Sequence, residues 1–391
     1  MLPAAGFSTA FFMKTLIQNV TVISPQSRLE GQSILLEAGK IVSVGESAMP
    51  ADEVIDGNGL LAVPGFFDIH CHGADGADVC DNSLEAVRHV AQKKLAEGVT
   101  TWLPTTLTQP KEILCDIVGK VALYREQQDF TRCPGLHIEG PYINRDKAGA
   151  QNPEFVRLPD WEELRALHAI APAMIVSLAP EMPGALELIA AATKAGIVCS
   201  AAHTSATYAQ LADGIAAGLK HLTHFGNAMT PLHHREIGVV GGGLYDSRVK
   251  LELICDTIHL CPDMLKMIFA VVPIERLLMI TDSVAASWIG NGTMKLGGLD
   301  VLIENHVARL KEGGALAGST LLANEGLRNV VEVTGWATEK VIQATSWNQA
   351  QSLGMQGFGK IEAGYHADIT LLREDFSVAR TIVGGESRFI A

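Results

Sequence analysis

The chain has 391 residues, of which 48% are hydrophobic and 6% aromatic, and its formal net charge is -13 at pH 7. This length and apolar content suit one barrel-sized domain together with a smaller one. The negative charge argues against a protein that coats nucleic acid or an anionic membrane, so neither is predicted as a partner. The seven cysteines show no paired C-x-x-C spacing, which favours a reducing compartment and predicts a cytoplasmic protein.

Residues 1–12 carry an apolar patch without a basic segment before it, which is unlike a signal peptide. We predict that they form a disordered extension, or that they precede a working start at Met13. No apolar run in the chain approaches the roughly 18 residues of a membrane-spanning helix.

Alternating strand and turn patterns occupy residues 16–45 and return at residues 364–391. We expect the two ends to pair into a small β-sandwich that a larger domain interrupts. The predicted boundaries give residues 13–63 and 358–391 to the sandwich and residues 64–357 to the larger domain.

Short buried runs alternate with helical segments through the middle of the chain. Two of the helical segments, residues 83–98 and 184–196, end in a glycine, as a helix C-terminus often does. Eight strand–helix units predict an α/β fold in which a parallel sheet closes into a (β/α)8 barrel. A hairpin at residues 295–314 is expected as an insertion after the eighth strand. The predicted strands are 66–70, 99–104, 135–139, 174–179, 197–202, 219–224, 249–255 and 277–281.

Histidines and carboxylates follow five of these predicted strands. The C-terminal ends of barrel strands share one rim, where the chemistry of such barrels gathers. Each residue alone has an ordinary structural explanation, such as a helix cap or a core histidine, but their coincidence on one rim favours a site for a divalent metal, zinc or non-haem iron. The candidates are His70, His72, Glu139, His203, His224 and Asp282.

This set of groups suits the hydrolysis of an amide. A metal lowers the pKa of a bound water from about 15.7 toward about 7, so that a metal-bound hydroxide becomes the nucleophile, and it polarises the carbonyl. Asp282 would take the proton of that water and pass it to the leaving nitrogen. No lysine stands at a strand end where a bridging carbamate would be expected, so a site with two ions would be bridged by Glu139.

Several short motifs resemble the amidohydrolase superfamily, and within it the N-acetylglucosamine-6-phosphate deacetylase family, over nearly the whole chain. The motifs are HIEGPY, AAHTSA, HFGNAM, ICDTIH and MITDS. The resemblance implies hydrolysis of the acetamide of N-acetylglucosamine-6-phosphate to glucosamine-6-phosphate and acetate, with Asp282 as the catalytic acid and base. It implies a principal metal at Glu139, His203 and His224, and a second at His70 and His72, hence one or two ions per subunit.

The same resemblance implies where the sugar phosphate binds. Asn227 and Ala228 would lie beside it, and Arg235 and His259 would bind the phosphate from a neighbouring subunit, so a homodimer is expected. Gln151 stands where some family members carry a histidine near the substrate amide; it can donate a hydrogen bond but carries no charge.

The sequence alone leaves other functional interpretations to be considered. Gly226 precedes Asn227 where a bulkier residue is usual, which is expected to widen the sugar pocket and leaves the galactosamine epimer as an alternative substrate. Another amidohydrolase would use the same histidines and aspartate. A non-catalytic barrel scaffold would be expected to lose ligands, and none is missing here. A glycosidase would need a second acid on the rim and leaves the histidines unexplained.

Overall fold

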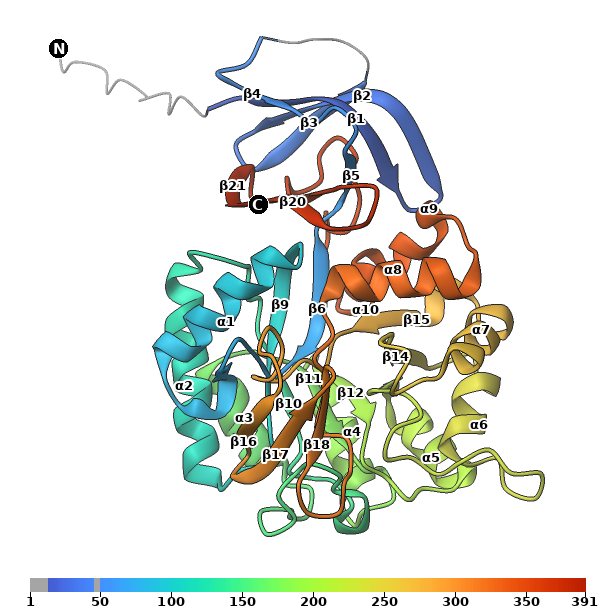
Figure 1. Ribbon diagram of the computed structural model, residues 1–391. Coiled ribbons are helices and arrows are strands. Elements are labelled where there is room, and N and C mark those ends of the chain that lie inside the picture. Colours follow the sequence, from blue (N-terminus) through green and yellow to red (C-terminus); the bar gives the residue numbers. More distant parts are fainter. Residues whose placement is uncertain (1–12, 46–49) are drawn as a thin grey trace, which may run out of the picture.

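The computed structural model describes residues 13–45 and 50–391 (Figure 1). The extension predicted over residues 1–12 lies outside the described residues. Within the described part, no helix is both long enough and apolar enough to cross a membrane.

Eight parallel strands among the described residues form the barrel, and all eight were predicted from the sequence. They run in the order β15-β14-β13-β12-β11-β10-β9-β6. The backbone N–H of Asp282 donates to the carbonyl of His70 over 2.9 Å, which joins the two ends of this order and closes the barrel. The strands are β6 (Phe66–Cys71), β9 (Val99–Thr106), β10 (Leu136–Glu139), β11 (Ala173–Leu178), β12 (Val198–Ala201), β13 (Leu219–Leu222), β14 (Lys250–Ile254) and β15 (Leu277–Ile280).

Helices surround the barrel strands (Figure 1). The first begins where the Ser83 side chain accepts a hydrogen bond from the Ala86 N–H, and it stops just before Gly98, whose φ of 81° suits the left-handed turn after a helix. The helices are α1 (Leu84–Ala96), α2 (Lys111–Gln127), α3 (Trp161–Ile170), α4 (Ala185–Lys194), α5 (Tyr208–Ala217), α6 (Gly238–Tyr245), α7 (Pro262–Val271), α8 (Ala323–Thr334), α9 (Thr338–Val341) and α10 (Trp347–Ser352).

Both ends of the chain form one further sheet, as predicted. Its order is β21-β20-β19-β5-β1-β2-β3, with β4 paired to β1. Ile17, Ile34, Ile369 and Ile382 share a core that is separate from the barrel's. This supports the small β-sandwich domain, while its boundaries stay a prediction. The strands are β1 (Thr15–Ser24), β2 (Ser27–Glu37), β3 (Lys40–Gly45), β4 (Glu53–Asp56), β5 (Leu61–Pro64), β19 (Ile369–Leu372), β20 (Val378–Val383) and β21 (Glu386–Ile390).

The insertion after the eighth barrel strand differs in detail from the predicted hairpin. It has three antiparallel strands, β16 (Gly292–Leu296), β17 (Leu299–Glu304) and β18 (Val307–Leu310). Gly297 and Gly298, with φ of 55° and 88°, make the first tight turn. Leu296 packs with Leu107 and Val284 of the barrel rim, so the insertion lies against the C-terminal end of the barrel.

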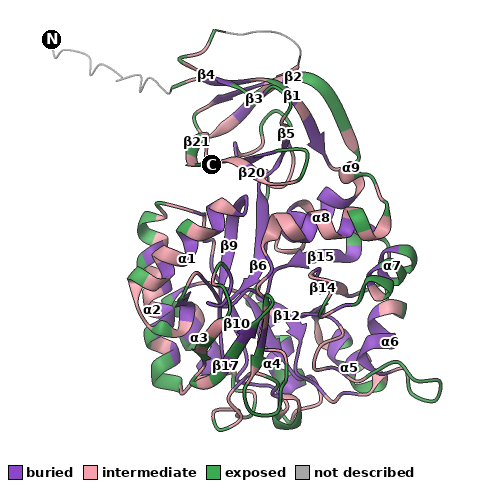
Figure 2. Cartoon of the chain, viewed as in Figure 1, coloured by how far each residue is buried: buried purple, intermediate pink, exposed green. Residues whose placement is uncertain are grey.

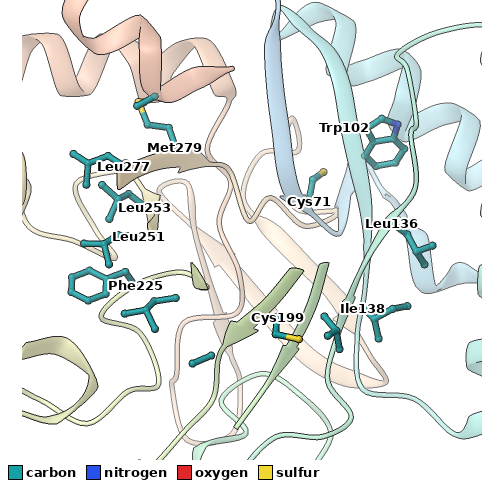
Figure 3. Packing of buried hydrophobic residues seen from close by; sticks show 14 of the residues in the cluster. Cys71, Trp102, Leu136, Ile138, Cys199, Phe225, Leu251, Leu253, Leu277 and Met279 are labelled. Carbon is teal, nitrogen blue, oxygen red and sulfur yellow. The ribbon is translucent and has the colours of Figure 1, made fainter. Parts of the chain in front are cut away.

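The main apolar core lies between the strands and the surrounding helices (Figures 2 and 3). On β14, Leu251 and Leu253 point into this layer, whereas Glu252 between them points into the barrel. The interior also holds buried polar groups, among them His137 and Ser177. The barrel therefore has an apolar outer layer and a polar centre beneath its rim.

Candidate active site

The six candidate ligands predicted from strand ends lie together at one end of the barrel. Their donor atoms form two groups, His70, His72 and Asp282 in one and Glu139, His203 and His224 in the other. Within each group the donor atoms lie within 4.8 Å of one another. All six residues are buried.

Glu139 lies between the two groups. Its Oε1 is 2.9 Å from His224 Nε2 and 3.3 Å from His203 Nε2, while its Oε2 is 3.3 Å from His72 Nε2. Asp282 Oδ1 is 3.2 Å from His70 Nε2 and 3.3 Å from His72 Nε2. Each carboxylate therefore lies against Nε2 atoms that could bind a cation together with it.

Backbone carbonyls fix the orientation of two of the imidazoles. His203 Nδ1 is 2.8 Å from the carbonyl oxygen of Lys147, and His72 Nδ1 is 3.2 Å from that of Thr105. A carbonyl oxygen only accepts, so in each ring Nδ1 carries a proton, which leaves Nε2 as the nitrogen that could bind a metal ion. Both Nε2 atoms face the carboxylates, where a metal ion would bind.

Three of the six residues have backbone conformations that L-residues rarely adopt. His203, His224 and Asp282 have φ of 45°, 36° and 50°, respectively. Such conformations cost free energy and persist only where the surrounding structure enforces them, and they cluster at functional sites. The strand ends are therefore shaped to aim these side chains rather than to continue the sheet.

The site is an assembly of opposite charges that depend on one another. Burial by itself would raise the pKa of the Glu139 carboxyl, but the surrounding histidines lower that pKa well below its usual value. The pKa of Asp282 is likewise lowered, against the effect of burial, by His70 and His72. Among the described residues, neither carboxylate pairs with a lysine or arginine. When these imidazoles are neutral, as metal ligands are, the two buried carboxylates need a cation in their place.

Gln151 lies at the edge of this cluster, with both ends of its amide bound by the protein. Nε2 donates to Glu139 Oε2 over 2.5 Å, and Oε1 accepts from the Thr108 N–H over 2.6 Å. Sequence reasoning placed Gln151 near a substrate amide; the structure adds a contact with Glu139 that the sequence did not indicate.

A cavity of about 400 Å³ opens above the cluster. Asn227 and Ala228, predicted beside the sugar phosphate, line it together with Gln151. His259, predicted to bind the phosphate from a neighbouring subunit, lines the cavity of its own chain. His259 Nδ1 is fixed by Asp256 Oδ2 over 2.6 Å. The apolar lining includes Leu107, Val284, Leu296, Ala315 and Leu316.

Two other residues singled out in the sequence lie apart from this cavity. Arg235 is exposed on the loop before α6, where its guanidinium contacts His234, and it is not among the lining residues. Gly226 is also absent from the lining. Its φ of +92° suits glycine, and an added Cβ would lie 3.3 Å from Leu260 Cδ2. The absence of a side chain at Gly226 thus permits the positive φ and the close packing against Leu260.

Sequence reasoning missed a polar group inside the barrel. Glu252, His221 and His137 are buried beneath the rim, and Glu252 and His137 lie near His70. The signals in the sequence are a glutamate in the apolar strand VKLELIC and a histidine within each of the predicted strands GLHIE and LKHLTH.

Comparisons with known proteins agree with this geometry. A profile of the amidohydrolase family matches residues 61–388. The N-acetylglucosamine-6-phosphate deacetylase of Lysinibacillus sphaericus is 32% identical over 383 residues, covering 97% of this chain and 98% of the relative. The N-acetylgalactosamine-6-phosphate deacetylase of Escherichia coli O157:H7 is 34% identical over 330 residues, covering 83% and 87%.

Solved structures give the same result. The crystal structure of N-acetylglucosamine-6-phosphate deacetylase from Thermotoga maritima superposes with a TM-score of 0.88 at 35% identity, covering 96% of this chain and 100% of that one. The Pasteurella multocida enzyme of the same name superposes with a TM-score of 0.91 at 27% identity, covering 96% and 99%.

Proposed function

Because the chain belongs to the amidohydrolase family, we propose that it hydrolyses the acetamide of N-acetylglucosamine-6-phosphate to glucosamine-6-phosphate and acetate. The observation that carries the proposal is the buried set of four imidazoles and two carboxylates at the floor of a cavity lined by Asn227 and His259. Relatives with this name match over nearly the full length of the chain.

The donor set fits a divalent metal, either zinc or iron. We propose that Glu139, His203 and His224 hold the principal ion, and that His70 and His72 hold a second with Glu139 between the two. The Nδ1–H groups of His72 and His203, each bound to a carbonyl, leave Nε2 to bind the ion and support this assignment. A bound metal would lower the pKa of its bound water from about 15.7 toward about 7 and polarise the amide carbonyl.

Asp282 is the proposed general acid and base. It lines the cavity, and its Oδ1 is close to both His70 Nε2 and His72 Nε2, which supports a role beside the attacked amide. As a carboxylate it accepts the proton of the attacking water. As a carboxylic acid it then gives that proton to the leaving nitrogen, so one group serves both steps.

The phosphate is proposed to bind beside Asn227, the backbone near Ala228 and His259, all of which line the cavity. Asp256 orients His259. We assign Arg235 of a neighbouring subunit to the same phosphate, in a homodimer. Its exposure, and its absence from the cavity of its own chain, support a role across an interface.

We also propose that the protein is cytoplasmic. All seven cysteines lie in the described residues and are free thiols, as a reducing compartment favours.

N-acetylgalactosamine-6-phosphate is the second candidate substrate, because a relative named for that deacetylase is 34% identical to this chain. The two sugars differ only in the configuration at one hydroxyl. The deciding experiment measures acetate release from each 6-phosphate, by purified protein with and without added zinc or iron. We expect the glucosamine compound to be the better substrate and chelation to abolish turnover. A protein that binds metal yet releases acetate from neither would be a scaffold or an amidohydrolase with another substrate.

A further inference from the structure

The barrel interior beneath the candidate site contains a carboxylate that the proposed reaction does not use. Glu252 on β14 is fully buried. Its Oε1 accepts a hydrogen bond from His221 Nδ1 over 2.8 Å. The other nitrogen of His221 meets the hydroxyl of Ser352 at the end of α10. One oxygen of Glu252 is therefore fixed by His221, whose other ring nitrogen is itself in contact with Ser352.

The second oxygen of Glu252 faces His70. Glu252 Oε2 and His70 Nδ1 are both buried, and neither has a hydrogen-bond partner within the described residues. They lie 3.9 Å apart. That is too long for a hydrogen bond, and a shift of about 1 Å would bring the atoms to the usual N–H···O distance. Buried polar atoms without partners are costly, so two that face each other call for an explanation.

The opposite edge of the His70 ring faces the candidate metal position. Its Nε2 lies 3.1 Å from His72 Nε2 and 3.2 Å from Asp282 Oδ1. An imidazole that gives its Nε2 lone pair to a cation carries its proton on Nδ1. A metal on one edge of His70 thus creates a hydrogen-bond donor on the other edge, toward Glu252.

Another buried histidine, His137, cannot take over this role. It packs edge-on against His70, with ring centroids 4.6 Å apart. Its Nδ1 is bound to the carbonyl of Ile69 over 3.0 Å and its Nε2 to the Ser177 hydroxyl over 2.6 Å. Both nitrogens are used, so His137 limits the tilt of His70 but offers it no acceptor.

We propose that Glu252 is a positioning residue for His70: it accepts the Nδ1–H and so fixes the ring with Nε2 toward the ion shared with His72. His221 holds the far oxygen of Glu252 and keeps the carboxylate from turning away. The inference rests on the proposed function in that it requires an ion at His70 and His72. Loss of a carboxylate behind a metal-binding histidine typically costs 10- to 100-fold in metal affinity.

The test is a titration of metal-free protein with Zn²⁺ in competition with a chromophoric chelator. Glu252→Gln has a single carbonyl oxygen, which can accept from His221 or from His70 but not from both. The matched control is Glu163→Gln, a buried carboxylate on α3 that pairs with Arg157 away from the cavity. We expect wild type and the control to bind two ions, and Glu252→Gln to bind the second about 10- to 100-fold more weakly while the first changes less than twofold.

A His70→Ala background separates positioning from a general structural effect. There, Glu252→Gln should cause no further loss of Zn²⁺ affinity; a further loss would overturn the inference. If Glu252→Gln does not fold, Glu252→Asp, whose carboxylate is retracted from His70, should weaken the second ion in the same way, and unchanged affinity would overturn the inference. Equal affinities of Glu252→Gln and wild type for both ions would overturn it and leave the proposed function standing. A wild type that binds fewer than two ions would overturn both the two-ion site and this inference.

Discussion

The amide of Gln151 ties Glu139 to the backbone of the neighbouring strand end, with 2.5 Å from Nε2 to Glu139 Oε2 and 2.6 Å from the Thr108 N–H to Oε1. Glu139 is thereby held in a fixed orientation between the two groups of histidines. A glutamine can do this because its amide carries a donor and an acceptor at once.

Replacement of Gln151 by leucine, which has a similar size and no polar atoms, should therefore weaken metal binding. We expect about a tenfold or greater loss of affinity and a comparable fall in kcat/KM. Metal content after dialysis against a chelator and steady-state kinetics measure the two effects. Gln349→Leu is the control, because that buried amide bonds to the Met279 and Ala344 carbonyls away from the cavity. Unchanged metal retention in Gln151→Leu would mean that its contact with Glu139 is incidental.

The principal ion should depend on each of its histidines. His203→Ala and His224→Ala are expected to lose that ion and turnover together, because removing one of three protein ligands leaves the site open on one side. Metal analysis of the purified variants checks this. His168→Ala on α3, outside the cavity, should retain both metal and activity. Full activity of His203→Ala with metal at the wild-type stoichiometry would contradict the assignment of His203 as a metal ligand.

Asp282→Asn should separate chemistry from binding. An amide cannot shuttle a proton, so we expect kcat to fall strongly, while metal content and KM stay near the wild-type values. Steady-state kinetics with parallel metal analysis give the answer. A raised KM with kcat preserved would make Asp282 a residue that binds the substrate.

Arg235→Ala tests the phosphate contact. A guanidinium binds phosphate strongly in a desolvated site, so KM for the 6-phosphate should rise about tenfold or more, while the slow reaction of unphosphorylated N-acetylglucosamine stays nearly unchanged. Arg165→Ala on α3 is a control for loss of an exposed arginine. Equal losses on both substrates would instead give Arg235 a role in the fold or the metal site.

The same variant tests whether the contact crosses subunits. A mixture of Arg235→Ala and Asp282→Asn chains should recover part of the activity through hybrid dimers, because some sites then combine an intact Asp282 with an intact Arg235. Lack of recovery in a mixture shown to contain hybrids would place Arg235 in the site of its own chain.

The barrel and the candidate ligands could be predicted because local patterns determine them. Each barrel strand is a short buried run, and parallel strands bring their C-terminal ends to one rim, so His70 and His224 meet although they are far apart in the chain. Glu252 could not be predicted in this way. Its partners His221 and His70 come from other strands, and only the closed barrel decides which inward-facing side chains meet.

Some details of backbone conformation could also not be predicted from the sequence. The motif around His203 predicts a ligand, but it indicates neither the positive φ of His203 nor the contact of its Nδ1 with the Lys147 carbonyl, which lies 56 residues away in the chain. The insertion gained a third strand because Gly297 and Gly298 allow a tight reversal, which the alternation of side chains alone does not reveal.

The shared sheet of the two chain ends has a consequence for synthesis. Strand β5 pairs with β1 on one side and with β19 on the other. During translation β5 leaves the ribosome long before β19 exists, so its outer edge has no partner while the whole barrel is made. Unpaired edges invite pairing with other chains. The nascent protein therefore carries an unfinished sheet until its final residues emerge, and its exposure to aggregation should be greatest when translation stalls within the barrel.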